Sequence, residues 1–166
     1  MSTLELPREP NPSPKTTEVL DALRAQHRAL DIHLDEMCRL VRADDRGDGR
    51  DAMRACWGKL EDEVLAHLNL EEMHMLPVLA KKHPDNVREV RGEHERIREL
   101  LGEIGVALDL HMVRAEQIER LAAGLRTHAV QEETGLYAWA EEELGSSARD
   151  VFLRRLRERI AALTGP

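Results

Sequence analysis

Two segments of the chain place a glutamate four residues after a histidine. His67 precedes Glu71 in the first segment, and His128 precedes Glu132 in the second. In an α-helix, four residues advance about 6 Å and rotate about 40° beyond one full turn, so each pair shares one face. Imidazole nitrogen and carboxylate oxygen, without thiolate, suit iron, manganese or zinc. The two pairs are therefore candidate metal ligands.

Two further histidines, His27 and His94, extend this pattern. His27 and His67 are equidistant from Gly47, which lies in a segment rich in Gly and Asp, and His94 and His128 are equidistant from residue 111. Residues that are equidistant from a hairpin turn lie at the same height on two antiparallel helices, because every helical residue advances by the same rise. We expect the four imidazoles to lie in one layer of a helical bundle.

Composition and periodicity predict the helices that such a layer needs. The chain is rich in Ala, Leu, Glu and Arg, and its apolar residues recur at helical spacing between short breaks that contain Gly or Pro. We expect helices over 16–43, 50–82, 86–110, 114–144 and 147–163. Short connections between long amphipathic helices indicate an up-down-up-down arrangement. The predicted fold is all-α, a four-helix bundle with a short fifth C-terminal helix over 16–166, preceded by a flexible proline-rich arm over 1–15.

Burial of this polar layer is unfavourable unless its charged and polar atoms have partners. Unpaired charges and unsatisfied polar atoms each cost several kcal/mol inside a protein. Two cations about 3.5 to 4 Å apart remove this cost, because two carboxylates can bridge them while two histidines bind each ion. The six side chains are sufficient for a dinuclear site.

The pattern resembles the hemerythrin-like family, also called the HHE cation-binding domain. Members of this family carry a histidine on the first helix, His-x3-Glu on the second, a histidine on the third, and His-x3-Glu or a near variant on the fourth. The resemblance covers about residues 16–144. It implies a non-heme di-iron centre with two iron ions, for which manganese and zinc are the alternative metals. The ligands that it implies are His27, His67, Glu71, His94, His128 and Glu132.

One position departs from the oxygen-carrying members of that family. Those members have a second histidine one turn after the ligand on the third helix, and this chain has Arg98 there. A guanidinium remains protonated and cannot bind a metal, so we expect Arg98 to pair with a carboxylate such as Glu95 or Glu99. Reversible oxygen carriage is therefore not expected.

Several other polar residues lie near the predicted layer in the sequence. Asp31 follows His27 by four residues, and His74 follows His67 by seven, so both are candidates for a supporting role beside the ligands, as is Arg98. The ordinary interpretation of Asp31 is an exposed helical residue. Glu72 and Glu133 follow the two ligand glutamates by one residue and are expected to face solvent or to support the site.

The two cysteines, Cys38 and Cys56, are also equidistant from Gly47. We expect them to face one another in the core as free thiols. They lie three helical turns, or about 16 Å, from the histidine layer and therefore do not bind its metal. Two cysteines without a CxxC motif are typical of a reducing compartment.

The sequence leaves three classes of function open. The favoured one is a non-enzymatic protein that binds or senses oxygen, nitric oxide or iron. The second is a di-iron enzyme that acts on peroxide or nitric oxide, with a carboxylate such as Asp31 moving protons. The third is a metal-free helical interaction module. A ferritin-like site would need two Glu-x-x-His motifs, and the fourth helix has Gly135 where the second histidine would stand. An HExxH zinc-protease motif is absent from the sequence.

Charge and hydropathy limit the partners. The chain has 24 basic and 32 acidic residues, a net charge of −8, which disfavours nucleic acid and anionic membrane surfaces. An apolar run of the roughly 20 residues that a membrane span requires is missing, as is an apolar signal-peptide core. We therefore expect a cytoplasmic protein with no nucleic-acid or membrane partner. A protein partner cannot be inferred from the sequence.

Overall fold

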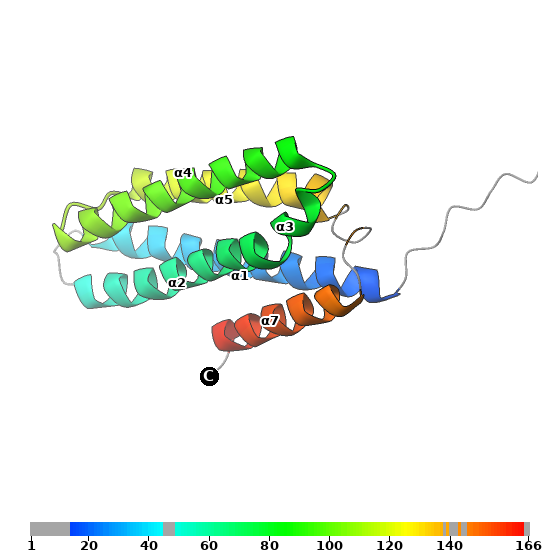
Figure 1. Cartoon of the computed structure of the whole chain (residues 1–166). Helices are drawn as coiled ribbons and strands as arrows, with labels where there is room; N and C mark the ends of the chain where they lie inside the picture. The colour runs from blue at the N-terminus through cyan, green and yellow to red at the C-terminus, as the bar shows by residue number, and fades with distance from the viewer. Residues whose placement is uncertain (1–13, 45–48, 138, 140–142, 144–145, 165–166) are drawn as a thin grey trace, which may run out of the picture.

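Apolar residues at every third or fourth position form four long helices, α1 (Pro14–Ala43), α2 (Arg50–His74), α4 (Pro84–Asp109) and α5 (Ala115–Gln131). The computed structural model describes residues 14–44, 49–137, 139, 143 and 146–164. The four helices run alternately in opposite directions, and no strand occurs among these residues (Figure 1). The predicted all-α, up-down-up-down bundle is confirmed. Among the described helices, none combines the length and the apolar character that crossing a membrane requires.

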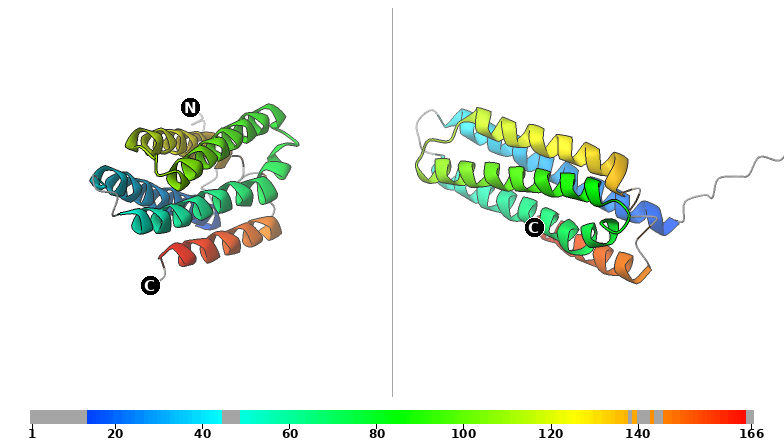
Figure 2. Two further views of the ribbon diagram at one scale, coloured as in Figure 1. Left: turned by 90° about the vertical axis from the view of Figure 1, so that its left-hand side faces the viewer. Right: turned by 45° about the horizontal axis from the view of Figure 1, so that its top comes forward.

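The helix α7 (Ser146–Thr164) is the predicted C-terminal helix. It lies along the outside of α1 and α2, on the side away from α4 and α5 (Figure 2). Phe152 and Leu156 are fully buried in one apolar cluster with Leu23 of α1 and Leu70 of α2. This apolar stripe attaches the helix to the bundle. The predicted flexible arm over 1–15 falls almost entirely outside the described residues.

The second helix ends earlier than the sequence pattern predicts. The pattern predicts a helix that continues to residue 82, but α2 ends at His74 and a short helix, α3 (Leu76–Leu79), follows. Pro77 is the physical reason, because proline has no backbone N–H and its ring would clash with the carbonyl of Met73 in a continuous helix. The break turns the chain across the end of the bundle towards α4 (Figure 1).

The fourth helix also departs from the prediction of one regular helix over 114–144. After α5, a single π-helical segment, η1 (Glu132–Leu136), intervenes, and the backbone N–H of Tyr137 bonds to the carbonyl of Glu132, five residues earlier. Such π-helical turns are frequent at functional sites. Residues 138, 140–142 and 144 of the predicted helix lie outside the described residues.

Two apolar clusters fill the bundle, one on either side of a polar layer. On α1 the first cluster includes Leu30 and the second Leu23, and His27 lies between them. On α4, His94 likewise separates Val90 of the second cluster from Ile97 of the first. The polar layer is thus enclosed by hydrophobic core along the bundle axis, which shields it from water at both ends of the bundle.

Candidate metal centre

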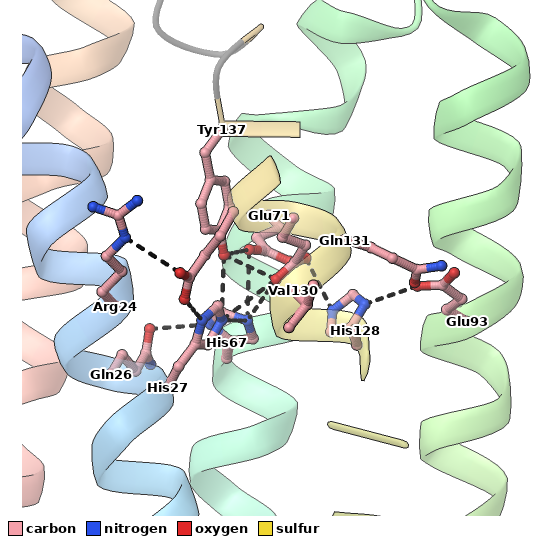
Figure 3. Close-up of polar contacts among 12 residues, drawn as sticks. Arg24, Gln26, His27, His67, Glu71, Glu93, His128, Val130, Gln131 and Tyr137 are labelled. Carbon is pink, nitrogen blue, oxygen red and sulfur yellow. Dashed lines mark hydrogen bonds and ion pairs between the residues drawn. The ribbon is translucent and has the colours of Figure 1, made fainter. Parts of the chain in front are cut away.

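Six side chains from all four long helices and η1 meet in this polar layer. The structure brings together the residues that sequence reasoning selected: His27 of α1, His67 and Glu71 of α2, His94 of α4, His128 of α5 and Glu132 of η1. Five of them are at most 3% exposed, and the side chain of His27 is 10% exposed. Figure 3 shows three of the site histidines, His27, His67 and His128, gathered around Glu71.

The inward-facing atoms form two groups. In the first group, Nε2 of His27 lies 3.3 Å from Nε2 of His67 and 3.4 Å from Oε2 of Glu132, and Nε2 of His67 lies 3.5 Å from Oε1 of Glu71. In the second group, Nε2 of His94 lies 3.5 Å from Oε2 of Glu71, and Nε2 of His128 lies 2.9 Å from Oε1 of Glu132. Each carboxylate therefore directs one oxygen to each group, the arrangement that a bridging carboxylate needs.

The second group consists of buried polar atoms that lack hydrogen bonds. Oε2 of Glu71, Nε2 of His94, Nε2 of His128 and Oε1 of Glu132 have no hydrogen-bond partner within the described part of the chain. The 2.9 Å approach of His128 to Glu132 is close in distance, but its direction is not that of a hydrogen bond. Each unsatisfied buried group costs about 1 to 3 kcal/mol. A cation between these lone pairs would remove that cost, so the donor set fits a metal ion.

In each of the four site histidines, the ring nitrogen that points away from the layer, Nδ1, lies within hydrogen-bond distance of an acceptor. The Nδ1 partners are Glu133 for His27 at 3.0 Å, Gln26 Oε1 for His67 at 3.1 Å, Glu72 for His94 at 2.8 Å and Glu93 for His128 at 3.0 Å. Because all four partners accept, Nδ1 carries the proton and Nε2 can present a lone pair to the interior. This is how histidines that bind metals are oriented in proteins.

A comparison with protein families agrees with this geometry. The model of the hemerythrin HHE cation-binding domain matches residues 18–140, with an overlapping second match over 85–162. The chain belongs to the hemerythrin HHE cation-binding domain family. Neither the curated proteins nor the solved structures yield a match to it. In this hemerythrin-like chain, donor atoms of His67, Glu71, His128 and Glu132 lie within 4.8 Å of one another and could hold a metal ion.

Sequence reasoning missed how the outer acceptors are arranged. Gln26 and Glu93 each precede a site histidine by one residue, and Glu72 and Glu133 each follow a site glutamate by one. One residue rotates a helix by about 100°, so these side chains point sideways to the next helix instead of inwards. Each bonds a histidine of a different helix. Glu72 and Glu133 were among the residues expected to face solvent or to support the site, whereas Gln26 and Glu93 were missed. A search for polar residues adjacent to the site histidines would have found these two.

Arg98 pairs with a carboxylate, although not with the residues that we predicted. Its two Nη atoms lie 2.8 and 3.0 Å from the two oxygens of Glu72, and Nη2 is also 3.1 Å from Oδ1 of Asn69. Glu95 and Glu99 are exposed on α4 and do not serve as its partners. Burial opposes the charge of Glu72, but hydrogen bonds from Arg98 and His94 outweigh it and lower the pKa of this carboxyl. Arg98 thus acts on the site through Glu72.

The other two supporting candidates do not contact the site histidines. His74 lies at the end of α2 and lines a surface hollow with Met73, Arg155 and Glu158, away from the site histidines. Seven residues carry it about 10.5 Å along the axis, which is too far from the layer. Asp31 binds Nε of Arg126 at 2.6 Å and is 43% exposed. Asp31 therefore forms an ion pair near the surface, and a supporting role for it stays a prediction.

Tyr137 is the site residue that sequence reasoning missed entirely. Its hydroxyl donates to Oε1 of Glu71 at 2.8 Å or to Oε2 of Glu132 at 2.9 Å, and it lies 3.3 Å from Nε2 of His27. The side chain is fully buried. Burial and the charges of the two carboxylates raise the pKa of Tyr137 well above its usual value. Without a cation, the phenol is therefore neutral.

A cavity connects the polar layer to the surface between α1 and α5. Its volume is about 340 Å³, and three of the site histidines line it: His27, His67 and His128. Its walls include the apolar side chains of Leu30, Leu34 and Leu125, and Arg24, Arg28, Asp31 and Arg126 also line it. A small molecule can reach the site by this route.

The cysteines lie at the margin of the core. Cys38 and Cys56 are free and half-buried, and both contact the first apolar cluster. Burial raises the pKa of both thiols, which favours the unreactive protonated form. Free thiols were expected, but the two side chains are less deeply buried than we predicted.

In the metal-free protein, protons take the place of a cation. Burial opposes the charged form of His94, but the neighbouring carboxylates of Glu132 and Glu71 outweigh it and raise the pKa of His94 to about 10. For His128, burial is likewise outweighed by the neighbouring carboxylate of Glu132, and the pKa rises to about 9. Burial also opposes the charge of Glu132, yet the four neighbouring histidines hold its pKa well below the usual value. Metal ions therefore compete with protons for these nitrogens.

The metal-free protein should lose stability as the solution becomes alkaline. Because the folded pKa values of His94 and His128 exceed the value of about 6.5 in the unfolded chain, their contribution is complete below pH 6.5 and is lost as the pH rises through 9 to 10. We expect a loss of several kcal/mol, measured by urea unfolding of metal-free protein between pH 6 and 10. A flat profile over this range would show that folding does not raise the pKa values of the two histidines.

Proposed function

We propose that this chain binds two non-heme iron ions in its polar layer. His27 and His67 would hold one ion and His94 and His128 the other, with Glu71 and Glu132 bridging them. The division of carboxylate oxygens between the two donor groups carries the proposal. The unsatisfied atoms of the second group and the four outer acceptors support it further. Iron fits this nitrogen and oxygen set, and manganese and zinc are the alternative metals.

We further propose that the chain binds or senses a small molecule such as oxygen or nitric oxide, or iron itself, and is not an enzyme. The cavity between α1 and α5 supports this role, because it leads from the surface to three of the site histidines. When bound, iron supplies a redox-active centre to which a small ligand can bind. The protein supplies the orientation of the imidazoles, through the acceptors on Nδ1, and the apolar surroundings that exclude bulk water.

The metal content tests this proposal. Protein loaded anaerobically with ferrous iron and passed through a desalting column should retain two iron ions per chain by elemental analysis. Retention of no metal, whether iron, manganese or zinc is offered, would favour the metal-free interaction module. The same iron-loaded protein should consume no more than a few equivalents of peroxide or nitric oxide. Sustained turnover of either would contradict the binding role and favour the enzyme.

A further inference from the structure

The only tyrosine of the chain lies at the candidate metal centre. We propose that the phenol oxygen of Tyr137 is a ligand of the iron ion held by His27 and His67, and binds it as phenolate when the iron is ferric. This inference rests on the proposed function, because it adds a donor to the same site. The family pattern of histidines and glutamates contains no tyrosine. Three features of Tyr137 support its ligation: its contacts, its asymmetric position and the backbone that places it.

The distances from the Tyr137 hydroxyl to its neighbours are those expected between ligands of the same metal ion. Ligands about 2.1 Å from a metal and at right angles to one another are about 3.0 Å apart. The hydroxyl of Tyr137 lies 2.8 Å from Oε1 of Glu71, 2.9 Å from Oε2 of Glu132 and 3.3 Å from Nε2 of His27. A single ion can therefore accept all four atoms. His67 adds a fifth donor to the same group.

Tyr137 contacts one donor group only. Both carboxylate oxygens that it contacts belong to the first group, and the oxygens of the second group, Oε2 of Glu71 and Oε1 of Glu132, have no hydrogen-bond partner in the described part of the chain. The first group thus has five donors and the second has four. Two iron ions held in this way would differ from each other in ligand number and type.

The π-helical turn is what places Tyr137 at the site. In a regular α-helix, a residue five positions after Glu132 would be rotated by about 140° and would face away from it. In η1 the backbone bond spans five residues, from the carbonyl of Glu132 to the N–H of Tyr137, so the two residues lie on the same side. Figure 3 shows the ring of Tyr137 directed into the cluster. The local irregularity therefore has a specific result, an additional oxygen donor in the buried layer.

Binding exchanges one proton for one bond to the metal. The O–H bond of Tyr137 breaks, the oxygen forms a bond to ferric iron, and the proton leaves to solvent, with no change in the oxidation state of the ion. The positive charge of a bound metal favours the deprotonated oxygen, as it does for other ligands that lose a proton on coordination.

The optical spectrum of the ferric protein tests the inference. Phenolate bound to ferric iron gives an intense charge-transfer band in the visible region, and resonance Raman excitation within that band shows the ring vibrations of tyrosine. We expect both signals in the wild-type protein loaded with two ferric ions per chain. Because Tyr137 is the only tyrosine, these signals have a single source. Tyr137→Phe keeps the ring and its packing and should abolish both, whereas His74→Gln, outside the site, should leave them unchanged.

The outcomes separate this inference from the proposed function. Two iron ions per chain without tyrosine vibrations would overturn the ligation by Tyr137 and leave the di-iron proposal intact. Failure of the wild-type protein to retain iron would overturn both. If Tyr137→Phe does not fold or does not retain iron, the Raman spectrum of the wild-type protein decides alone, because its tyrosine vibrations report the bond directly.

Discussion

Replacing Glu132 by glutamine should remove most of the stabilisation that iron gives to the fold. Oε2 of Glu132 belongs to the first donor group and Oε1 to the second, so the loss of this one carboxylate weakens both proposed sites. At a free metal concentration a hundredfold above its dissociation constant, each ion adds about 2.7 kcal/mol, or about 5 kcal/mol for two. For a domain of this size, 1 kcal/mol corresponds to about 2 to 4 °C, so iron should raise the wild-type Tm by roughly 10 to 20 °C.

Thermal unfolding followed by circular dichroism, with and without ferrous iron under anaerobic conditions, measures this difference. Glu132→Gln should show an increase of only a few degrees, because the amide preserves the volume but not the charge. Glu99→Gln is a matched control, since Glu99 is an exposed glutamate of α4 away from the polar layer. An equal increase in Glu132→Gln and in the wild-type protein would show that Glu132 does not bind the metal.

Oxygen should oxidise the ferrous protein irreversibly. Arg98 stands where the oxygen-carrying relatives have a further histidine, and its guanidinium is held by Glu72 and Asn69. It cannot supply a nitrogen to the second donor group, which therefore has two histidines and two carboxylate oxygens. With fewer nitrogen donors, the site does not hold bound oxygen reversibly, and the ferrous iron is oxidised to ferric iron. We therefore expect the optical spectrum to change when oxygen is added, and we expect the ferrous spectrum not to return under vacuum.

The matched variant for this experiment is Arg98→His, which restores an imidazole at the same position. We expect slower oxidation of the ferrous form in this variant than in the wild-type protein. Both proteins are loaded anaerobically and shown to contain two iron ions before oxygen is added. A wild-type spectrum that returns fully over repeated vacuum cycles would support oxygen carriage and contradict the proposed effect of Arg98.

Regular helical geometry explains why so much of the site could be predicted. His27 and His67, and likewise His94 and His128, are equidistant from the two hairpin turns, and constant rise per residue is sufficient to place them in one layer. The prediction was less accurate where the helices are irregular. The end of α2 depends on the steric effect of Pro77, which hydrophobic periodicity alone does not take into account.

The remaining features depend on how helices face one another. Tyr137 reaches the site only because η1 is a π-helical turn, and no periodicity in the sequence indicated that turn. The acceptor for each outer histidine nitrogen comes from a neighbouring helix, as with Gln26 of α1 and His67 of α2. Such contacts require the relative rotation of two helices, which hydrophobic periodicity does not specify to within one side chain. For the same reason, Glu72 was not expected to be the partner of Arg98.

Anomalous X-ray scattering at the iron absorption edge, from crystals of the iron-loaded protein, tests the central claim most directly. We predict two anomalous peaks per chain, both between Glu71 and Glu132, with one peak next to Nε2 of His27 and His67 and the other next to Nε2 of His94 and His128. The peaks should lie about 3.5 to 4 Å apart, the usual separation in two-metal sites. A single peak, or peaks on surface carboxylates with this layer empty, would contradict the proposal that the six residues form a di-iron centre.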